Sequence, residues 1–280
     1  MDGLIIVNEV NTESINLAQI DLKGTSKLVI LLGTKEGIKG ISKKLRQDDD
    51  LVRVGKGIFI AGSSGGAHTE LLHSLPTLSF IRTREIPGIK ARLEDPYADR
   101  TYSIVSYRFN NPTPGQKKRV ERLLRRSMGI RIRPGVLLFP VLRARERRKV
   151  LDYEKGHSLL DSKEFNNQLK SIGALSMRWS RLRLAESKDS VHIREAIEST
   201  LNRDLLSIES KLHRIRELSK NPLASSDTLR KQSLAVLRRY RKLKFKWVLA
   251  KTLWHYNAEK SLKRIYNLGL NTKYMIDSRD

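Results

Sequence analysis

The chain has 280 residues, of which 39% are hydrophobic and 30% are charged, and it contains no cysteine. This length allows two domains of ordinary size, and the lack of cysteine excludes disulfides, thiolate catalysis and cysteine-based zinc sites. No apolar run approaches the ~18 residues that a membrane-spanning helix requires. The first ten residues also lack the basic start of a secretory signal, so we expect a cytoplasmic protein.

The net charge of +25 is concentrated in two blocks. Residues 101–150 hold 14 Lys and Arg against 2 Asp and Glu, and residues 201–250 hold 13 against 4. A surface that only keeps a protein soluble mixes both signs of charge. The concentrated positive charge therefore predicts a polyanionic partner, with nucleic acid as the first candidate and an anionic membrane surface as the second.

The first third of the chain alternates apolar runs rich in β-formers with helical patterns. Thr34 is a candidate N-cap for the first helix, and the glycines of LVRVGKGIFIAG predict a kink within one strand. The expected elements are a strand at 4–10, a strand at 27–33, a helix at 35–46, a strand at 51–62, a helix at 67–74 and a strand from Leu78.

The second third repeats this order. A strand at 102–109, a Lys/Arg-rich helix at 115–128 and a strand at 130–139 precede a helix at 160–172 and a strand that starts at Leu175. Both thirds thus predict the β-α-β-(β)-α-β order of a ferredoxin-like module, and we interpret the repeat as an internal duplication. The second copy carries an insertion at 141–158, and a linker with prolines and a glycine separates the copies.

The second copy also resembles known families over about forty residues. Its helix ends in Leu-Leu-x-x-x-x-Gly at Gly129, and its next strand contains Arg-x-x-x-Gly-Val-Leu-Leu from Arg131. This pattern resembles the small ferredoxin-fold nuclease of CRISPR adaptation and related modules of phenylacetate and chromate regulators. In the nuclease family an acidic residue ends the first strand and binds the metal. Ser106-Tyr107-Arg108 and Gly33-Thr34 stand at those places here, so the resemblance implies the fold without the nuclease activity.

Beyond residue 185 the pattern becomes that of long amphipathic helices. Apolar residues recur at steps of three or four between 189 and 221, where Asn221-Pro222 ends the helix. Ser225-Ser226-Asp227 can cap a second helix that runs to about Asn267, with Gly269 as its stop. The short connection predicts an antiparallel hairpin.

These elements define an α+β fold with two tandem ferredoxin-like modules followed by an all-α helical hairpin. The expected boundaries are a first module at 1–86, a linker at 87–100, a second, basic module at 101–185 and the hairpin at 186–280.

No catalytic, metal or cofactor site can be argued from the sequence. None of the six histidines has a ligand spacing. Asp48-Asp49-Asp50 is typical of a solvated loop, and the glycine-rich stretch 62–66 lacks the lysine of a phosphate-binding loop. Trp179 is expected to pack under a helix rather than to stack on a base.

The basic clusters are the candidate binding residues, because arginine forks and lysine ammonium groups bind phosphate. A single charge run is usually only a solvated face, but two runs with few compensating acids favour a function. The first cluster comprises Lys117, Lys118, Arg119, Arg122, Arg125, Arg126, Arg131, Arg133, Arg143, Arg145, Arg147 and Arg148. The second comprises Arg238, Arg239, Arg241, Lys242, Lys244 and Lys246, interleaved with Tyr240, Phe245 and Trp247.

The sequence thus predicts a non-enzymatic protein that contacts the phosphate backbone of RNA or DNA through basic helices. One alternative is an enzyme that processes or modifies nucleic acid. The other is a structural subunit of a ribonucleoprotein or protein assembly, with the C-terminal helices as the interaction element.

Overall fold

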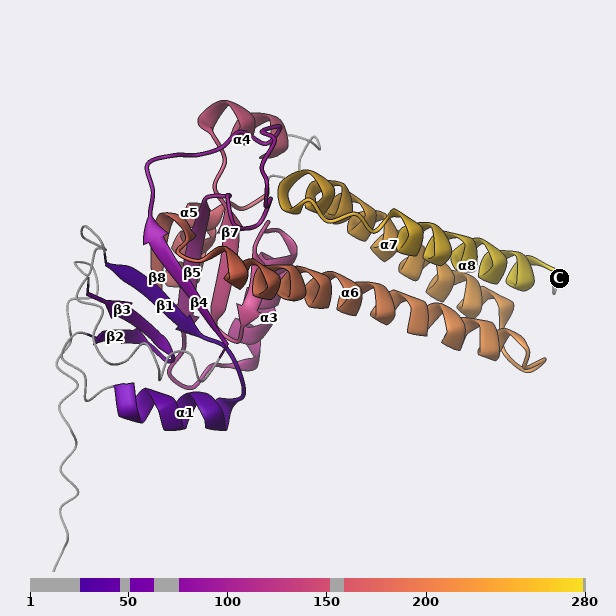
Figure 1. The fold of residues 1–280 in the computed structure, drawn as a ribbon. Helices are drawn as coiled ribbons and strands as arrows, with labels where there is room; N and C mark the ends of the chain where they lie inside the picture. Colours follow the sequence, from indigo (N-terminus) through magenta and orange to yellow (C-terminus); the bar gives the residue numbers. More distant parts are fainter. Residues whose placement is uncertain (1–25, 46–50, 63–75, 152–158, 279–280) are drawn as a thin grey trace, which may run out of the picture.

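The structure is a computed structural model that describes residues 26–45, 51–62, 76–151 and 159–278. Over these residues the chain forms an α/β body on an eight-stranded sheet, from which long C-terminal helices extend (Figure 1). The strand expected at 4–10 and the helix expected at 67–74 lie outside the described residues. Among the helices that are described, none combines the length and the apolar character needed to cross a membrane.

All strand pairs of the described sheet are antiparallel, in the order β2-β3-β1-β4-β8-β5-β7-β6. The strands are β1 Lys27–Leu31, β2 Leu51–Gly55, β3 Ile58–Ala61, β4 Thr77–Arg82, β5 Tyr102–Arg108, β6 Ile130–Arg133, β7 Val136–Pro140 and β8 Leu175–Leu184. The strands predicted at 27–33, 102–109 and from Leu78 and Leu175 are confirmed.

The two halves of the sheet have the same strand connectivity. In the first half β1 lies between β3 and β4, and β2 lies outside β3. In the second half β5 lies between β7 and β8, and β6 lies outside β7. The halves meet where β4 pairs with β8, with Phe80 opposite Leu184. The last strand of each half therefore forms the joint of one continuous sheet.

Two segments predicted as single strands are β-hairpins, so these predictions were wrong in detail. Residues 51–62 contain β2 and β3, and residues 130–139 contain β6 and β7. The turns lie at Gly57, with φ of 62°, and at Gly135, with φ of 79°. Only glycine adopts this left-handed backbone readily, and a Cβ on Gly135 would stand 2.7 Å from the carbonyl oxygen of Tyr107. The glycines that suggested a kink therefore reverse the chain.

The described helices are α1 Lys35–Lys44, α3 Pro114–Arg125, α4 Ala144–Leu151, α5 Ser162–Ser171, α6 Ser190–Ser219, α7 Ser226–Trp254 and α8 Glu259–Asp277, with a short 3-10 turn at Ser187–Asp189. The helices predicted at 35–46, 115–128 and 160–172 are confirmed as α1, α3 and α5. The stretch expected as an insertion contains α4.

Alternation along the strands gives the sheet two apolar faces. On one face, Val29 packs with the apolar side of α1, and Val105 packs with α3 and α5. On the other face, Leu28 and Ile104 belong to the largest core cluster, which continues into α6, α7 and α8. Asp189 connects α6 to the sheet, because its carboxylate accepts a hydrogen bond from the backbone of Ser79 at 3.2 Å. Buried Trp179 lies in this cluster, as expected.

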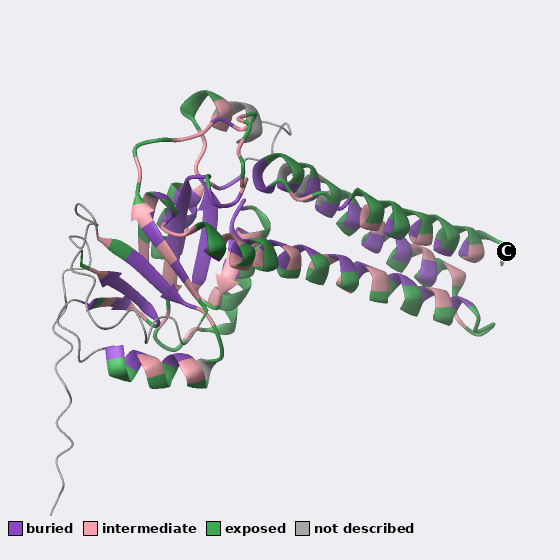
Figure 2. Ribbon diagram, in the orientation of Figure 1, coloured by how far each residue is buried: buried purple, intermediate pink, exposed green. Residues whose placement is uncertain are grey.

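The C-terminal region contains three helices rather than the two of a hairpin. The apolar stripe predicted on the first of them is buried (Figure 2): Ile193, Ile197, Leu201, Leu205, Ile208, Leu212 and Ile215. The second helix does not run to Asn267. It ends at Trp254, because His255 adopts a left-handed backbone with φ of 48°. Asn257 then starts α8 by accepting a hydrogen bond from the backbone of Glu259 at 3.1 Å.

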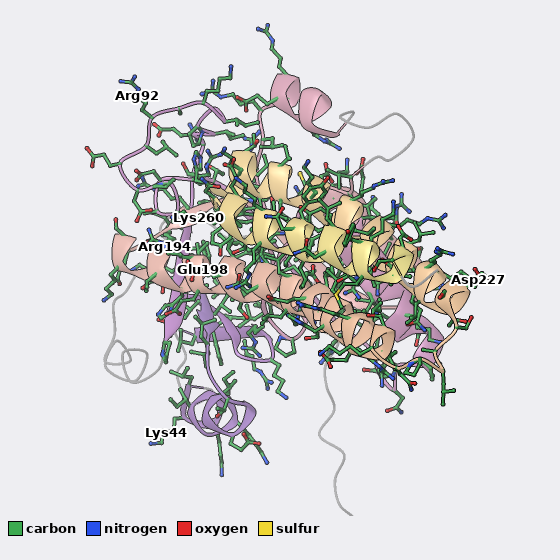
Figure 3. The ribbon with its side chains drawn as sticks, turned by 90° about the vertical axis from the view of Figure 1, so that its right-hand side faces the viewer. Lys44, Arg92, Arg194, Glu198, Asp227 and Lys260 are labelled. Atoms are coloured by element: carbon green, nitrogen blue, oxygen red, sulfur yellow. The ribbon has the colours of Figure 1, made fainter. Side chains whose placement is uncertain are left out.

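The end of α7 packs into the α/β body. The Trp254 ring stacks on buried Tyr102, with ring centroids 6.1 Å apart, and its Nε1 donates to the carbonyl of Met128 at 3.3 Å. Next to it, Arg100 donates to Nε2 of His255. A guanidinium has no acceptor, so His255 must accept here in its neutral form. Figure 3 shows the molecule from the side of these helices, with Arg194 labelled on α6 and Lys260 on α8.

Candidate nucleic-acid interface

Helix α3 presents the first group of cations. Thr113 caps the helix by accepting from the backbone of Gln116 at 3.2 Å, and the Gln116 side chain accepts from the backbone of Thr113 at 2.9 Å. This reciprocal cap fixes where the helix begins. Val120 and Leu123 are buried, and Leu124 packs partly buried against the same core cluster.

All six basic side chains of this helix and its C-cap are exposed: Lys117, Lys118, Arg119, Arg122, Arg125 and Arg126. The helix carries one acid, Glu121, and that carboxylate pairs with Arg131 of β6 at 3.1 Å. The helix therefore presents a strongly positive face, as its sequence predicts.

Arg133 has a different environment from its neighbours in the first cluster. Its guanidinium donates to the carbonyls of Leu31 and Lys56, each at 2.8 Å, and to that of Gly57 at 3.4 Å. Burial lowers the pKa of Arg133 below its usual value. Because these hydrogen bonds occupy the guanidinium, Arg133 connects the turn of the β6–β7 hairpin to that of the β2–β3 hairpin. We therefore leave it out of the candidate surface.

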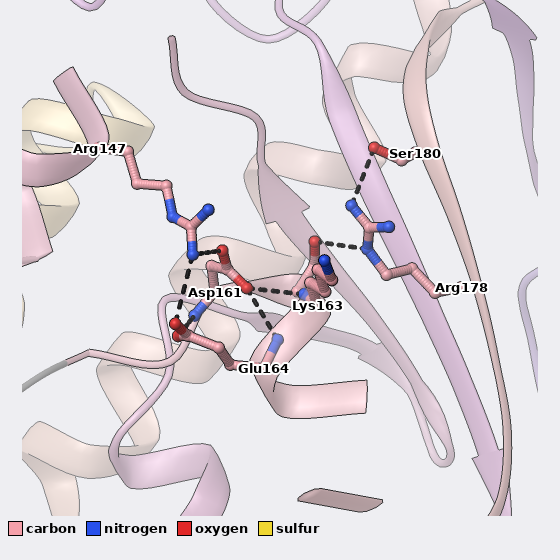
Figure 4. A network of polar contacts seen from close by, with 7 residues as sticks. Arg147, Asp161, Lys163, Glu164, Arg178 and Ser180 are labelled. Atoms are coloured by element: carbon pink, nitrogen blue, oxygen red, sulfur yellow. Dashed lines mark hydrogen bonds and ion pairs between the residues drawn. The ribbon is translucent and has the colours of Figure 1, made fainter. Parts of the chain in front are cut away.

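The arginines of and around α4 also have protein partners in part. Arg143 donates through Nε to the carbonyl of Ile86 at 2.8 Å. Arg147 lies between the carboxylates of Asp161, at 2.5 Å, and Glu164, at 3.3 Å (Figure 4).

Asp161 is also the N-cap of α5, so the contact with Arg147 holds α4 against α5. Arg145 is exposed. The side chain of Arg148 lies outside the described part of the chain.

Helix α7 carries the second group. Arg238, Arg239, Arg241 and Lys244 are exposed, whereas the side chains of Lys242, Phe245 and Lys246 are not described.

Two interleaved aromatic residues of this group point inward. Tyr240 donates to the carbonyl of Leu262 at 3.0 Å, and the Trp247 ring lies 5.6 Å from that of Tyr256. Both side chains are buried. These two aromatic rings therefore hold the helices together, whereas Arg241 and Lys244, which lie between them in the sequence, are exposed.

The structure brings the two basic groups together at one place. A polar hollow of about 220 Å³ is lined by Arg125 of α3, Arg131 of β6 and Arg239 of α7. It is also lined by Arg203 of α6, which belongs to neither predicted cluster. Arg203 lies beside Asp204 and outside both basic runs, so only the packing of α6 near β6 reveals it. Arg125 and Arg239 are far apart in the sequence, yet they line the same hollow.

A second hollow of about 630 Å³ lies between the 83–101 segment and the end of β8. Its lining includes Arg143 and Arg183 together with Glu85 and Asp99. The two signs of charge balance here, so this hollow has no clear preference for an anion. Among the described residues there is no group of three or more His, Cys, Asp and Glu side chains placed to hold a metal ion.

No family model matches the chain, and no curated protein matches its sequence.

Proposed function

We propose that this protein binds RNA or DNA without catalysing a reaction, mainly through phosphate contacts made by exposed basic side chains. The observation that carries the proposal is the exposure of all six cations on α3 and its C-cap. Arg239 of α7 lines the same hollow as Arg125 of that helix. Exposed Lys and Arg that neutralise phosphates release the counterions condensed along a nucleic-acid backbone.

The charge pattern favours backbone contacts over the reading of bases. Sequence readout needs side chains that reach base edges in a groove or aromatic rings that stack on single-stranded bases. Tyr240 and Trp247 are buried within the helices. The cations around them can contact phosphates of any sequence, so we expect similar affinities for unrelated sequences.

We further propose that the two halves of the sheet are ferredoxin-like modules that arose by duplication. The equivalent positions of β1 and β5 within their halves support this. So does the placement of α1 and α3 on the same face of the sheet. Superposition of residues 27–61 on residues 102–140 tests the proposal, because related modules must align strand for strand without reordering.

The binding proposal is tested with a triple variant in which Arg119, Arg122 and Arg126 become alanine. The matched control replaces three exposed lysines of the equivalent helix α1 with alanine: Lys39, Lys43 and Lys44. Both variants remove three charges, so a difference in their binding reports the position of the charges rather than the net charge. Filter binding over a salt series, with RNA and DNA of mixed sequence, measures the affinity and its salt dependence.

We expect the α3 variant to bind more weakly, and its log–log salt slope to flatten by about 0.7–0.9 for each phosphate that the protein no longer neutralises. The α1 control keeps the wild-type slope. Folding changes little in either variant, because isolated surface charges contribute little to stability. If the α3 variant keeps the affinity and salt slope of the wild type while a charge variant of α7 loses binding, then α7 is the main contact. If neither variant affects binding, the proposal is wrong.

One observation favours the second candidate function, a structural subunit of an assembly. Tyr266, Leu270 and Tyr274 follow one another at four-residue steps on α8 and are 47%, 45% and 76% exposed. An apolar row of this kind can dock a partner helix. A Tyr274→Ser variant that still binds nucleic acid but no longer retains a co-purifying protein would support this function.

A further inference from the structure

The hollow between α3, β6, α6 and α7 differs from the open surface of α3. The cations of α3 lie along one helix, and a nucleic-acid backbone can run past such a surface. The hollow, in contrast, is lined by four arginines from four different elements: Arg125, Arg131, Arg203 and Arg239. Such an arrangement can surround a small anion from several sides, whereas a continuous backbone needs an open path.

The charge of this hollow matches that of a small dianion. Its lining has four arginines and two carboxylates, Glu121 and Asp204, which leaves a formal charge of +2. Glu121 pairs with Arg131 at 3.1 Å and so holds that guanidinium in place. A phosphate monoester carries a charge of about −1.5 to −2 at neutral pH, whereas an internal phosphodiester carries one charge.

The size of the hollow also fits a terminal group. A volume of about 220 Å³ is room for a small anion together with several water molecules. A phosphate group with its bound waters can occupy this space. Thr200 of α6 adds a hydroxyl to the lining, which can donate to a phosphate oxygen.

We propose that this hollow binds the terminal phosphate monoester of a nucleic-acid strand, while the exposed face of α3 binds the adjoining backbone. This assignment rests on the proposed nucleic-acid binding and adds a preference for phosphorylated ends. The arginine forks bind the extra charge of the monoester by charge-assisted hydrogen bonds.

The test compares oligonucleotides of one sequence that carry a 5′-phosphate, a 3′-phosphate or hydroxyls at both ends, in RNA and in DNA. Fluorescence polarisation of the full chain, with the dye at the opposite end, gives the affinity ratio between phosphorylated and unphosphorylated strands. The hollow is altered by Arg239→Gln and, separately, by Arg203→Gln. Arg238→Gln is the matched control, because Arg238 is an exposed neighbour on α7 that does not line the hollow.

For the wild type we expect an affinity ratio of about tenfold or more for one phosphorylated end, the size expected for charge-assisted hydrogen bonds. The two hollow variants should lower this ratio to near one. Arg238→Gln should keep the ratio while weakening the binding of all strands alike. A thermal melt of each variant shows that it is folded.

Three results would overturn the assignment, and they are distinguishable. Equal binding of all strands by the wild type rejects the terminal-phosphate site but leaves the proposed function intact. A ratio that survives in both hollow variants places the preference elsewhere. A wild type that binds none of the strands rejects the proposed function, and the terminal-phosphate site with it.

Discussion

Replacing Arg133 with methionine tests whether this arginine stabilises the fold rather than binds a ligand. Methionine keeps an unbranched apolar side chain and removes only the guanidinium. The change removes the two hydrogen bonds at 2.8 Å to the carbonyls of Leu31 and Lys56, together with the longer one to Gly57. The sheet itself does not need these hydrogen bonds for strand pairing, so the folded state should form but with lower stability.

The expected loss of stability follows from the hydrogen bonds that Arg133 makes. A hydrogen bond to a charged group contributes about 1.5–3 kcal/mol, and Arg133 is only partly buried, so the lower end applies to each of the two short bonds. We expect the free energy of unfolding to fall by about 2–4 kcal/mol, with part of that decrease arising from carbonyls left without a donor. For a chain of this size, that corresponds to a decrease in melting temperature of roughly 5–10 °C.

Urea unfolding and thermal melts measure the effect, with Arg119→Met on exposed α3 as the control. The control should change stability by less than about 0.5 kcal/mol. The same two variants should behave in the opposite way in nucleic-acid binding, where only Arg119→Met flattens the salt slope. If Arg133→Met unfolds with the same midpoint as the control, the three hydrogen bonds do not stabilise the fold and our interpretation of this residue is wrong.

Three further predictions concern stability. Trp254→Ala should lower the free energy of unfolding by about 3–5 kcal/mol in denaturant titrations, because it removes a buried ring stacked on Tyr102; a decrease below about 1 kcal/mol would contradict the docking of α7 on the α/β body. Gly135→Ala should cost about 1–3 kcal/mol, whereas Gly115→Ala, where a Cβ meets only a side-chain oxygen at 3.8 Å, should be nearly neutral in the same assay. Burial, followed by the charge of Arg100, lowers the pKa of His255 below 6.5. Its contribution to stability is thus complete above this pH and disappears as the pH falls through the lower folded-state pKa, so His255→Asn should reduce the acid sensitivity of the unfolding midpoint.

The sequence predicts the elements of the sheet well because their signals are local. Apolar runs rich in β-formers indicate the strands, and apolar residues at helical spacing indicate α3. The hairpin turns at Gly57 and Gly135 are harder to predict, since a glycine alone does not tell how far the chain turns. Neither glycine nor proline marks the break at His255, and its contact with Arg100 forms only when α7 docks on the α/β body.

The candidate site could be predicted only as separate parts. Exposed cations on α3 follow from its sequence, because a narrow apolar stripe leaves the remaining positions to solvent. The role of Arg133 is hidden in the sequence, since its partners are backbone carbonyls of the other half of the sheet and any sequence supplies those. Arg203 is hidden for a related reason: its importance comes from the packing of α6 near β6, and no local pattern records that.

The hollow also links binding to the packing of the helices. The four arginines that line it repel each other, and the two carboxylates of the lining compensate only part of that charge. The repulsion opposes the docking of α6 and α7 beside α3, while the apolar contacts of Trp254 and Trp247 favour it. An anion bound in the hollow would reduce this repulsion, so it would bind the docked arrangement more tightly than an undocked one. By mass action, such an anion would stabilise that arrangement by RT ln(1 + [L]/Kd). The same charges that would recognise a nucleic-acid end would thus make the position of the C-terminal helices depend on whether that end is bound.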